Sequence, residues 1–103
     1  MQNRYACAPE HVKTMDTTEL RERFLIEDLF QPGEVSLVYS HQDRIIVGGA
    51  VPTDGPLTLP VPAELRATNF CDRRELGIVN VGADADVTVD GTTYTIQNKG
   101  CLY

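Results

Sequence analysis

The sequence predicts a mainly β domain, a sandwich or barrel of about seven short antiparallel strands with one short amino-terminal helix. Short alternating apolar runs recur along the chain, and turn-forming residues separate them at short intervals. The chain has 103 residues, which suits one domain. We therefore predict a single domain over residues 1–103, organised around the stretch from Arg73 to Tyr103.

A β-hairpin is the strongest local prediction in this stretch. The dipeptide Asp90-Gly91 tolerates the positive φ angles required at both corners of a two-residue type I′ turn. Apolar residues alternate on either side of it, as expected for two paired strands that share an apolar face. These residues are Val87 and Val89 before the turn, and Tyr94 and Ile96 after it.

A denser apolar run precedes the hairpin, from Leu76 to Val81, and Gly82 ends it. Its β-branched residues are typical of a strand buried on both sides, so we predict three consecutive strands of one antiparallel sheet. The last residues, Cys101 to Tyr103, look like the start of a further strand. A barrel that stops there has open edges, which invite pairing with another chain. Either a partner supplies the rest, or the sequence is a fragment.

The amino-terminal part contains the predicted helix. Residues 1–13 are polar and show no periodicity, so we expect an extended arm that is ordered only by a neighbour. The next residues predict a helix from Thr17 to Arg23, with Asp16 as its N-cap and Glu19 as its partner in a capping box. The apolar stripe of this helix is short, so it must pack against another element.

Two strands are predicted in the middle of the chain. Gln31-Pro32-Gly33 favours a turn, because proline presets φ at the first corner and glycine accepts the second. A strand then begins at Glu34, and a second strand, Ile45 to Val47, follows a polar corner over residues 41–44. We expect Gly48-Gly49 to end the second strand or form a bulge. The apolar face of the first strand consists of Val35, Leu37 and Tyr39.

The proline-rich stretch from Pro52 to Pro62 predicts an edge segment. Leu57, Leu59 and Val61 alternate between its prolines, and a segment at a sheet edge needs no ladder partner for its amide groups. The residues that follow, 63–66, predict one helical turn.

The composition argues against two classes of partner. A formal net charge of −6 and a pI of about 4.7 would repel nucleic acids and anionic membranes. The chain has neither an apolar signal segment nor a run near the ~18 apolar residues of a membrane span. Three widely spaced cysteines fit a reducing compartment better than a disulfide framework. We therefore expect a soluble cytoplasmic protein with no nucleic-acid or membrane partner.

The residues by themselves predict no catalytic group and no metal ligand. His11 and His41 are the only histidines, and neither has the neighbouring ligands that zinc or iron needs. His41 lies in a polar corner with Asp43, where a hydrogen-bonded histidine is favoured over a catalytic base. Cys71 is expected to be a small buried residue rather than a reactive thiol.

Arg73, Arg74 and Glu75 allow two interpretations. The favoured one is a salt-bridged group at a strand end, since such pairs are common and contribute little to stability. The other makes the two arginines a fork for a carboxylate, because the guanidinium matches carboxylate geometry. The composition does not choose between them.

Several separated motifs resemble one enzyme family. The most specific are YSH-x-DRIIVGG, from Tyr39 to Gly49, and RRELG, from Arg73 to Gly77; HVKTMDTTELRERFL and FCDRRELGIVNVG also match. From His11 to Tyr103 the chain resembles the amino-terminal part of the 5-keto-4-deoxyuronate isomerase family, the bicupin ketol-isomerases of pectin and uronate breakdown.

The resemblance implies a partial cupin, that is, a double-stranded β-helix or jelly roll whose barrel is incomplete in this chain. It implies an oligomeric enzyme that isomerises 5-dehydro-4-deoxy-D-glucuronate and holds zinc in its carboxy-terminal cupin. Glu75 stands where the glutamate of a cupin motif would, but no histidine precedes it in residues 70–74. We therefore expect no cofactor in this chain, although zinc belongs to the full-length family.

Three hypotheses follow. The chain is an amino-terminal isomerase fragment with a scaffold and oligomer role, inactive alone, whose partner is the missing carboxy-terminal cupin or a second copy. Alternatively, it is a non-catalytic binding or assembly module that completes its barrel by strand exchange. In the third, arginines bind the carboxylate of a sugar acid. The candidate residues for this third hypothesis are Arg44, Arg73, Arg74 and Glu75.

Overall fold

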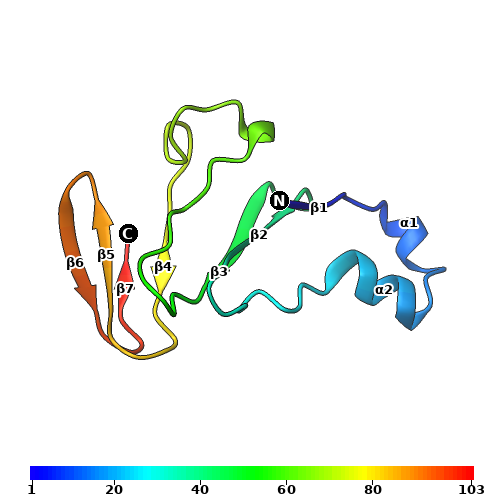
Figure 1. The fold of residues 1–103 in the computed structure, drawn as a ribbon. Helices are drawn as coiled ribbons and strands as arrows, with labels where there is room; N and C mark the ends of the chain where they lie inside the picture. Colours follow the sequence, from blue (N-terminus) through cyan, green and yellow to red (C-terminus); the bar gives the residue numbers. More distant parts are fainter. The chain divides into compact units, whose positions relative to one another are not determined.

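The computed structural model describes residues 1–103 and consists mainly of short strands with few helices (Figure 1). This confirms the predicted mainly β class. The chain divides into two compact units, Met1–Glu64 and Leu65–Tyr103, and each is described by itself. The elements of the first unit are β1 (Gln2–Arg4), α1 (Pro9–Val12), α2 (Thr17–Phe24), β2 (Val35–Ser40), β3 (Ile45–Ala50) and the start of a 3₁₀ turn, η1 (Ala63–Leu65). Those of the second are β4 (Ile78–Val79), β5 (Ala85–Val89), β6 (Thr92–Ile96) and β7 (Cys101–Leu102).

The first unit is built on a three-stranded sheet in the order β1-β2-β3. β2 and β3 pair antiparallel over six positions each, from Val35 opposite Ala50 to Ser40 opposite Ile45. β1 runs parallel to β2 on its other side. The prediction of an arm ordered only by a neighbour is therefore wrong. The free edge of β2 offers unpaired backbone groups, and these bind a segment whatever the period of its side chains.

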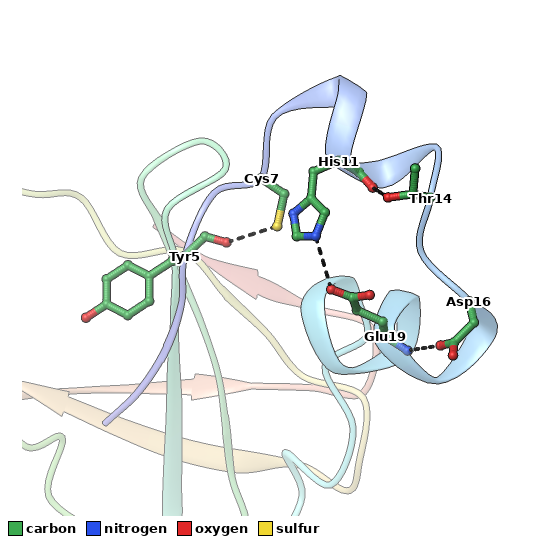
Figure 2. Close-up of polar contacts among 6 residues, drawn as sticks. All are labelled: Tyr5, Cys7, His11, Thr14, Asp16 and Glu19. Atoms are coloured by element: carbon green, nitrogen blue, oxygen red, sulfur yellow. Dashed lines mark hydrogen bonds and ion pairs between the residues drawn. The ribbon is translucent and has the colours of Figure 1, made fainter.

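Helix α2 forms where the sequence predicts it, and its N-cap is confirmed. The Asp16 side chain accepts a hydrogen bond from the Glu19 amide at 2.8 Å. The second half of the expected capping box is replaced, because the Glu19 carboxylate contacts His11 Nε2 at 3.3 Å instead (Figure 2). This pair links α2 to the short helix α1. The His11 side chain is 49% exposed and that of Glu19 is 36% exposed, so water screens the pair and it contributes little to stability.

Gly48 and Gly49 lie inside β3, so the prediction that they end the strand is wrong. A Cβ atom on Gly49 would lie 2.8 Å from the carbonyl carbon of Leu29, and one on Gly48 would lie 2.9 Å from the Ser36 carbonyl oxygen. The glycines are therefore required by the close approach of other backbone segments. Both glycines are paired with residues of β2, so the strand continues through them.

Of the predicted connections in the first unit, the turn before β2 is confirmed, and the proline-rich edge segment pairs with no strand. Gly33 has φ 78°, and the Glu34 amide donates to the Gln31 carbonyl at 3.1 Å, as in a type II turn. Residues 52–62 form no strand. Leu57 and Leu59 are nevertheless half-buried between exposed residues. Val61, the third residue of the predicted alternation, is exposed, and the prolines leave this stretch too few amide donors for a ladder on both edges.

The second unit contains the predicted hairpin. β5 and β6 pair antiparallel, with Val87 opposite Tyr94 and Val89 opposite Thr92. Asp90 and Gly91 have φ of 49° and 81°, as a type I′ turn requires. The strongest local prediction from the sequence is confirmed.

The predicted sheet of three consecutive strands is wrong. β4 pairs with β7 rather than with the hairpin, and it contains only two residues. Asn80 explains the break, because its Oδ1 accepts from the Gly82 amide at 2.9 Å and bends the chain into a turn. Nor is the run buried on both sides, since Val79 and Val81 are 64% and 66% exposed.

The buried apolar core is small. The largely buried apolar side chains are Val38 in the first unit, and Leu65, Phe70 and Ile96 in the second. Large apolar side chains are exposed in both units. No helix has the length and apolar character needed to cross a membrane.

Candidate functional site

An aromatic stack lies at the end of the three-stranded sheet. The His41 ring stacks on Tyr39, with centroids 4.3 Å apart and planes at 18°, and on Tyr5, with centroids 5.0 Å apart and planes at 15°. The His41 Nε2 atom lies 3.0 Å from the side-chain oxygen of Asn3. We call these four side chains the aromatic stack; they come from β1, β2 and the residues that directly follow each strand.

Strand register brings the stack together. Asn3 lies opposite Tyr39 in the parallel β1–β2 ladder, and the His41 amide donates to the Arg4 carbonyl at 2.9 Å, which extends that ladder by one step. Side chains two residues apart on a strand share a face, so Tyr39 and His41 point to the same side. The hydrogen-bonded corner histidine predicted from the sequence is confirmed. Its partner is Asn3 rather than Asp43, which the sequence could not indicate without the β1–β2 pairing.

Arg44 lies in the β2–β3 turn, next to the aromatic stack in the chain. It is exposed and has φ 48°, in the left-handed region that non-glycine residues rarely adopt. The turn holds this strained residue between two strands of a regular ladder. Its predicted role in binding a carboxylate stays a prediction.

The other candidate residues, Arg73, Arg74 and Glu75, lie in the second unit. The Arg74 guanidinium carbon is 5.5 Å from the centroid of the Phe70 ring, and its NH1 donates to the Phe70 carbonyl at 3.3 Å. Arg74 is thus held on a buried aromatic ring by a cation–π contact. Arg73 is exposed. No shared partner holds the Arg73 and Arg74 side chains side by side, and their role as a fork for a carboxylate stays a prediction.

The salt bridge expected for Glu75 is not formed. The ion pairs are His11 with Glu19 and Arg21 with Glu27, the latter at 2.6 Å. Hydrogen bonding with Glu75 raises the pKa of the Tyr103 hydroxyl above its ordinary value of 10.0, because the carboxylate stabilises the protonated phenol. Tyr103 lies far from Glu75 along the chain, so the charges next to Glu75 in the sequence did not reveal this contact.

Asp72 organises a polar loop that the sequence reasoning missed. Its carboxylate accepts hydrogen bonds from the amides of Asn69 at 2.8 Å and Thr68 at 3.0 Å, and from the Asn69 side chain at 3.1 Å. These bonds, led by the Asn69 amide, hold the pKa of Asp72 below its ordinary value of 3.8. The spacing T-N-x-x-D was the available signal, since such residues bond to nearby backbone groups.

A groove of about 640 Å³ lies in the first unit, lined by β1, β2 and the end of α2 with the residues after it. Arg4 reaches into its wall and donates from NH1 to the Glu22 carbonyl, while its Nε is buried without a partner. Arg21 is neutralised by Glu27 at 2.6 Å. The acidic side chains Glu22, Glu27 and Asp28 outnumber these two arginines in the lining, so the groove does not favour an anion.

The chain's own residues do not fit a zinc site. No group of three or more histidine, cysteine, aspartate or glutamate side chains comes together in residues 1–103, and a structural or catalytic zinc needs at least three such ligands. All three cysteines are free. Cys71 is exposed, so the prediction that it is buried is wrong. Its loop turns outward around Asp72, whereas Phe70 fills the core position next to it.

Comparison with known proteins identifies the family. No family model matches the chain. Curated relatives named 4-deoxy-L-threo-5-hexosulose-uronate ketol-isomerase match the whole chain, with 52% identity in Kineococcus radiotolerans, 48% in Halalkalibacterium halodurans and 50% in Bacillus pumilus. The chain spans about 37% of the length of the first two relatives and 38% of the third.

The chain is mainly β, and it matches the named ketol-isomerases over its whole length. The chain belongs to the 4-deoxy-L-threo-5-hexosulose-uronate ketol-isomerase family. This is the family of 5-keto-4-deoxyuronate isomerases that its motifs resemble, so the resemblance is confirmed.

Proposed function

We propose that this chain is the amino-terminal, cupin-like part of a 4-deoxy-L-threo-5-hexosulose-uronate ketol-isomerase. In this proposal it supplies scaffold and oligomer contacts and is inactive alone. The whole enzyme would interconvert 5-dehydro-4-deoxy-D-glucuronate and its keto isomer in the cytoplasm during pectin and uronate breakdown. The observation that carries the proposal is 45–52% identity over essentially the whole chain, against only 36–38% of the relatives' length.

The chemistry of the chain supports a non-catalytic role. Zinc in the whole enzyme would need ligands that these residues do not bring together. We therefore assign no catalytic step to them.

Exposed apolar side chains support the scaffold role. In the second unit, Val79, Val81 and Tyr103 are 64%, 66% and 85% exposed. Exposed apolar surface is characteristic of regions that contact other polypeptide. In the whole enzyme, the remaining part of the chain or another subunit would cover these side chains.

An activity assay tests the proposal. The purified 103-residue chain, supplied with zinc and 5-dehydro-4-deoxy-D-glucuronate, should show no isomerisation. The same chain joined to the remaining carboxy-terminal part of a relative should be active and bind zinc. Turnover by the short chain, or an inactive joined protein that folds and binds zinc, would contradict the proposal.

A second candidate is a binding or assembly module that completes its sheet with another copy. The two-stranded sheet of β4 and β7 favours it, because the outer edges of both strands have no partner strand and are free to pair with another copy. Light scattering separates the two ideas. A stable dimer with protected amide hydrogens along β4 and β7 would support exchange, and a monomer would exclude it.

A further inference from the structure

The prolines between β3 and η1 all stand at even positions. They are Pro52, Pro56, Pro60 and Pro62. No amide or carbonyl group of residues 52–62 forms a backbone hydrogen bond within the chain, and Figure 1 accordingly shows no strand between β3 and η1. The hydrogen-bonding groups of this stretch are therefore unpaired, and the spacing of the prolines distributes them unequally between its two edges.

The backbone of residues 56–62 has the character of an extended strand. No residue of this range has a positive φ. Leu59 and Val61 each precede a proline, which restricts them to the extended region. Leu57 and Leu59 are half-buried on either side of the exposed Thr58, and this alternation has the period of two that strand side chains show. The stretch is therefore shaped like a strand, although no strand pairs with it.

The two edges of this extended stretch differ in their hydrogen-bond donors, because alternate residues of a strand direct their N–H and C=O groups to opposite edges. We call the edge formed by residues 56, 58, 60 and 62 the proline edge; its prolines have no N–H group, and Thr58 is its single donor. The open edge consists of the backbone groups of Leu57, Leu59 and Val61, each with a donor and an acceptor. Pairing is thus prevented on one edge and permitted on the other.

The open edge has the properties of a docking site for a strand. A row of unpaired N–H and C=O groups is a template for pairing with another strand, and main-chain bonds of this kind attach extended segments to sheet edges. Charged side chains often protect such edges, but residues 56–62 carry none. The open edge therefore lacks the protection that the prolines give to the opposite edge.

The length of the open edge indicates where the docked strand comes from. A ladder of three residues is too short to offset the freedom that two separate chains lose on association, whereas a strand of the same polypeptide requires only loop closure. Two copies of this chain, each with a net charge of −6, would also repel each other. The matched region covers 36–38% of the relatives' length, so most of their polypeptide lies outside it.

We propose that the open edge receives a β-strand from the remaining, carboxy-terminal part of the full-length enzyme. The docked strand bonds to the amides of Leu57, Leu59 and Val61. The proline edge then forms the border of the completed sheet, where it stops a further strand from adding. This inference rests on the proposed function, which supplies the carboxy-terminal part, and it assigns the contact between the two parts to three backbone positions.

Amide hydrogen exchange tests the proposal in the joined protein, in which the 103-residue chain is followed by the remaining carboxy-terminal part of a relative. Exchange is measured at single residues by mass spectrometry and compared with the intrinsic rate of each amide. We expect the amides of Leu57, Leu59 and Val61 to exchange at least about tenfold more slowly than their intrinsic rates. Thr58 is the internal control, because its amide lies on the proline edge and should exchange near its intrinsic rate.

Two proline variants of the joined protein give a matched comparison. Val61→Pro removes an amide from the open edge, and Thr58→Pro removes one from the proline edge. Val61→Pro should accelerate exchange at Leu57 and Leu59 about tenfold, whereas Thr58→Pro should leave their exchange unchanged. Val61→Ala keeps the amide and shortens a side chain that is already 38% exposed, so it should also leave their exchange unchanged.

Four outcomes would overturn the proposal. They are exchange of the open-edge amides at their intrinsic rates in the folded joined protein, equal protection of Thr58 and its neighbours, equal effects of the two proline variants, or protection that appears in the 103-residue chain as its concentration rises. The last would assign the docked strand to a second copy. The first two outcomes need no substitution, so a variant that does not fold leaves them measurable.

The exchange measurement and the isomerase assay can fail independently. An active joined protein whose open edge exchanges at intrinsic rates would contradict this inference alone. A joined protein that folds and binds zinc, protects the open edge and shows no turnover would contradict the proposed function alone.

Discussion

The two units of the chain are stabilised in different ways. In the first unit, the β2–β3 ladder is six residues long, and two glycines allow backbone segments to approach closely. In the second unit, β4 and β7 pair over only two residues. Its connections depend on side chains that bond to backbone groups, above all Asn80. A long ladder and close backbone packing stabilise the first unit, whereas hydrogen bonds within turns stabilise the second.

This difference indicates which changes each unit tolerates. Close packing leaves no room for an added methyl group, so the first unit should be sensitive to volume. A unit held by turns and polar side chains should be sensitive to the loss of a hydrogen bond or of a positive-φ glycine. The following predictions test that contrast, from the largest expected effect to the smallest.

Gly49→Ala should be the most damaging change, lowering the free energy of unfolding by about 3 kcal/mol. The new Cβ would lie 2.8 Å from the Leu29 carbonyl carbon, so backbone must move. Urea unfolding followed by circular dichroism measures the loss, and amide exchange should place it in the first unit. Gly77→Ala is the control, since nothing lies within 4 Å of its Cβ. Equal stability of the two variants would refute the close-packing argument.

Asn80→Ala should destabilise the second unit by about 2 kcal/mol. The amide of Asn80 donates to the Ala83 and Ile96 carbonyls at 2.7 and 2.8 Å, and its oxygen accepts from Gly82. Removing it leaves a partly buried carbonyl unpaired. Amide exchange of β4 and β6 should increase while β2 and β3 keep their protection. Gln42→Ala, in an exposed turn, is the control. Faster exchange in β2 and β3 instead would show that the units are not separately stabilised.

Gly91→Ala should cost about 1 kcal/mol. The cost is due to the backbone alone, because Gly91 has φ 81° and nothing lies within 4 Å of an added Cβ. Thermal unfolding compared with Gly77→Ala isolates the effect of φ, since both sites are open. A neutral result would mean that the hairpin does not depend on its type I′ turn.

Asp72→Asn should have the smallest effect, and that effect should depend on pH. The pKa of Asp72 is lowered from 3.8 in the folded state. Its carboxylate therefore stabilises the fold above pH 3.8, and this stabilisation is lost as the pH falls through the lowered folded-state value. Unfolding midpoints of the variant and the unmodified chain should differ at neutral pH and converge in acid. A difference that persists at pH 2, about two units below the ordinary value, would assign the effect to the amide substitution and not to ionisation. Asp54→Asn, at an exposed site, is the control.

Sequence patterns predicted local structure well and pairing poorly. The β2 strand, the 3₁₀ turn at Ala63–Leu65 and the hairpin all form within the predicted stretches. β1 was missed because its polar residues carry no period, although its backbone pairs with β2. The run before the hairpin was assigned to the wrong partner, because a two-residue strand has too few side chains to specify one.

The candidate site likewise combines features predicted from the sequence with features that depend on strand pairing. His41 was singled out in the sequence as a hydrogen-bonded corner residue, but its partner Asn3 and the ring of Tyr5 belong to a segment that the sequence described as an arm. Arg44 was a candidate from its motif. No pattern in the sequence indicated the aromatic stack, because the stack exists only once β1 and β2 are paired.

The sequence by itself determined the mainly β class, the Asp16 cap, the turns at Pro32-Gly33 and Asp90-Gly91, and the family. Each structural feature in that set depends on residues a few positions apart, where steric preference and short hydrogen bonds decide the outcome. Only the tertiary structure decided the β1–β2 and β4–β7 pairings, the role of Gly48 and Gly49, and the aromatic stack. These features join distant segments through backbone groups that every residue carries, so the identity of the side chains does not specify them.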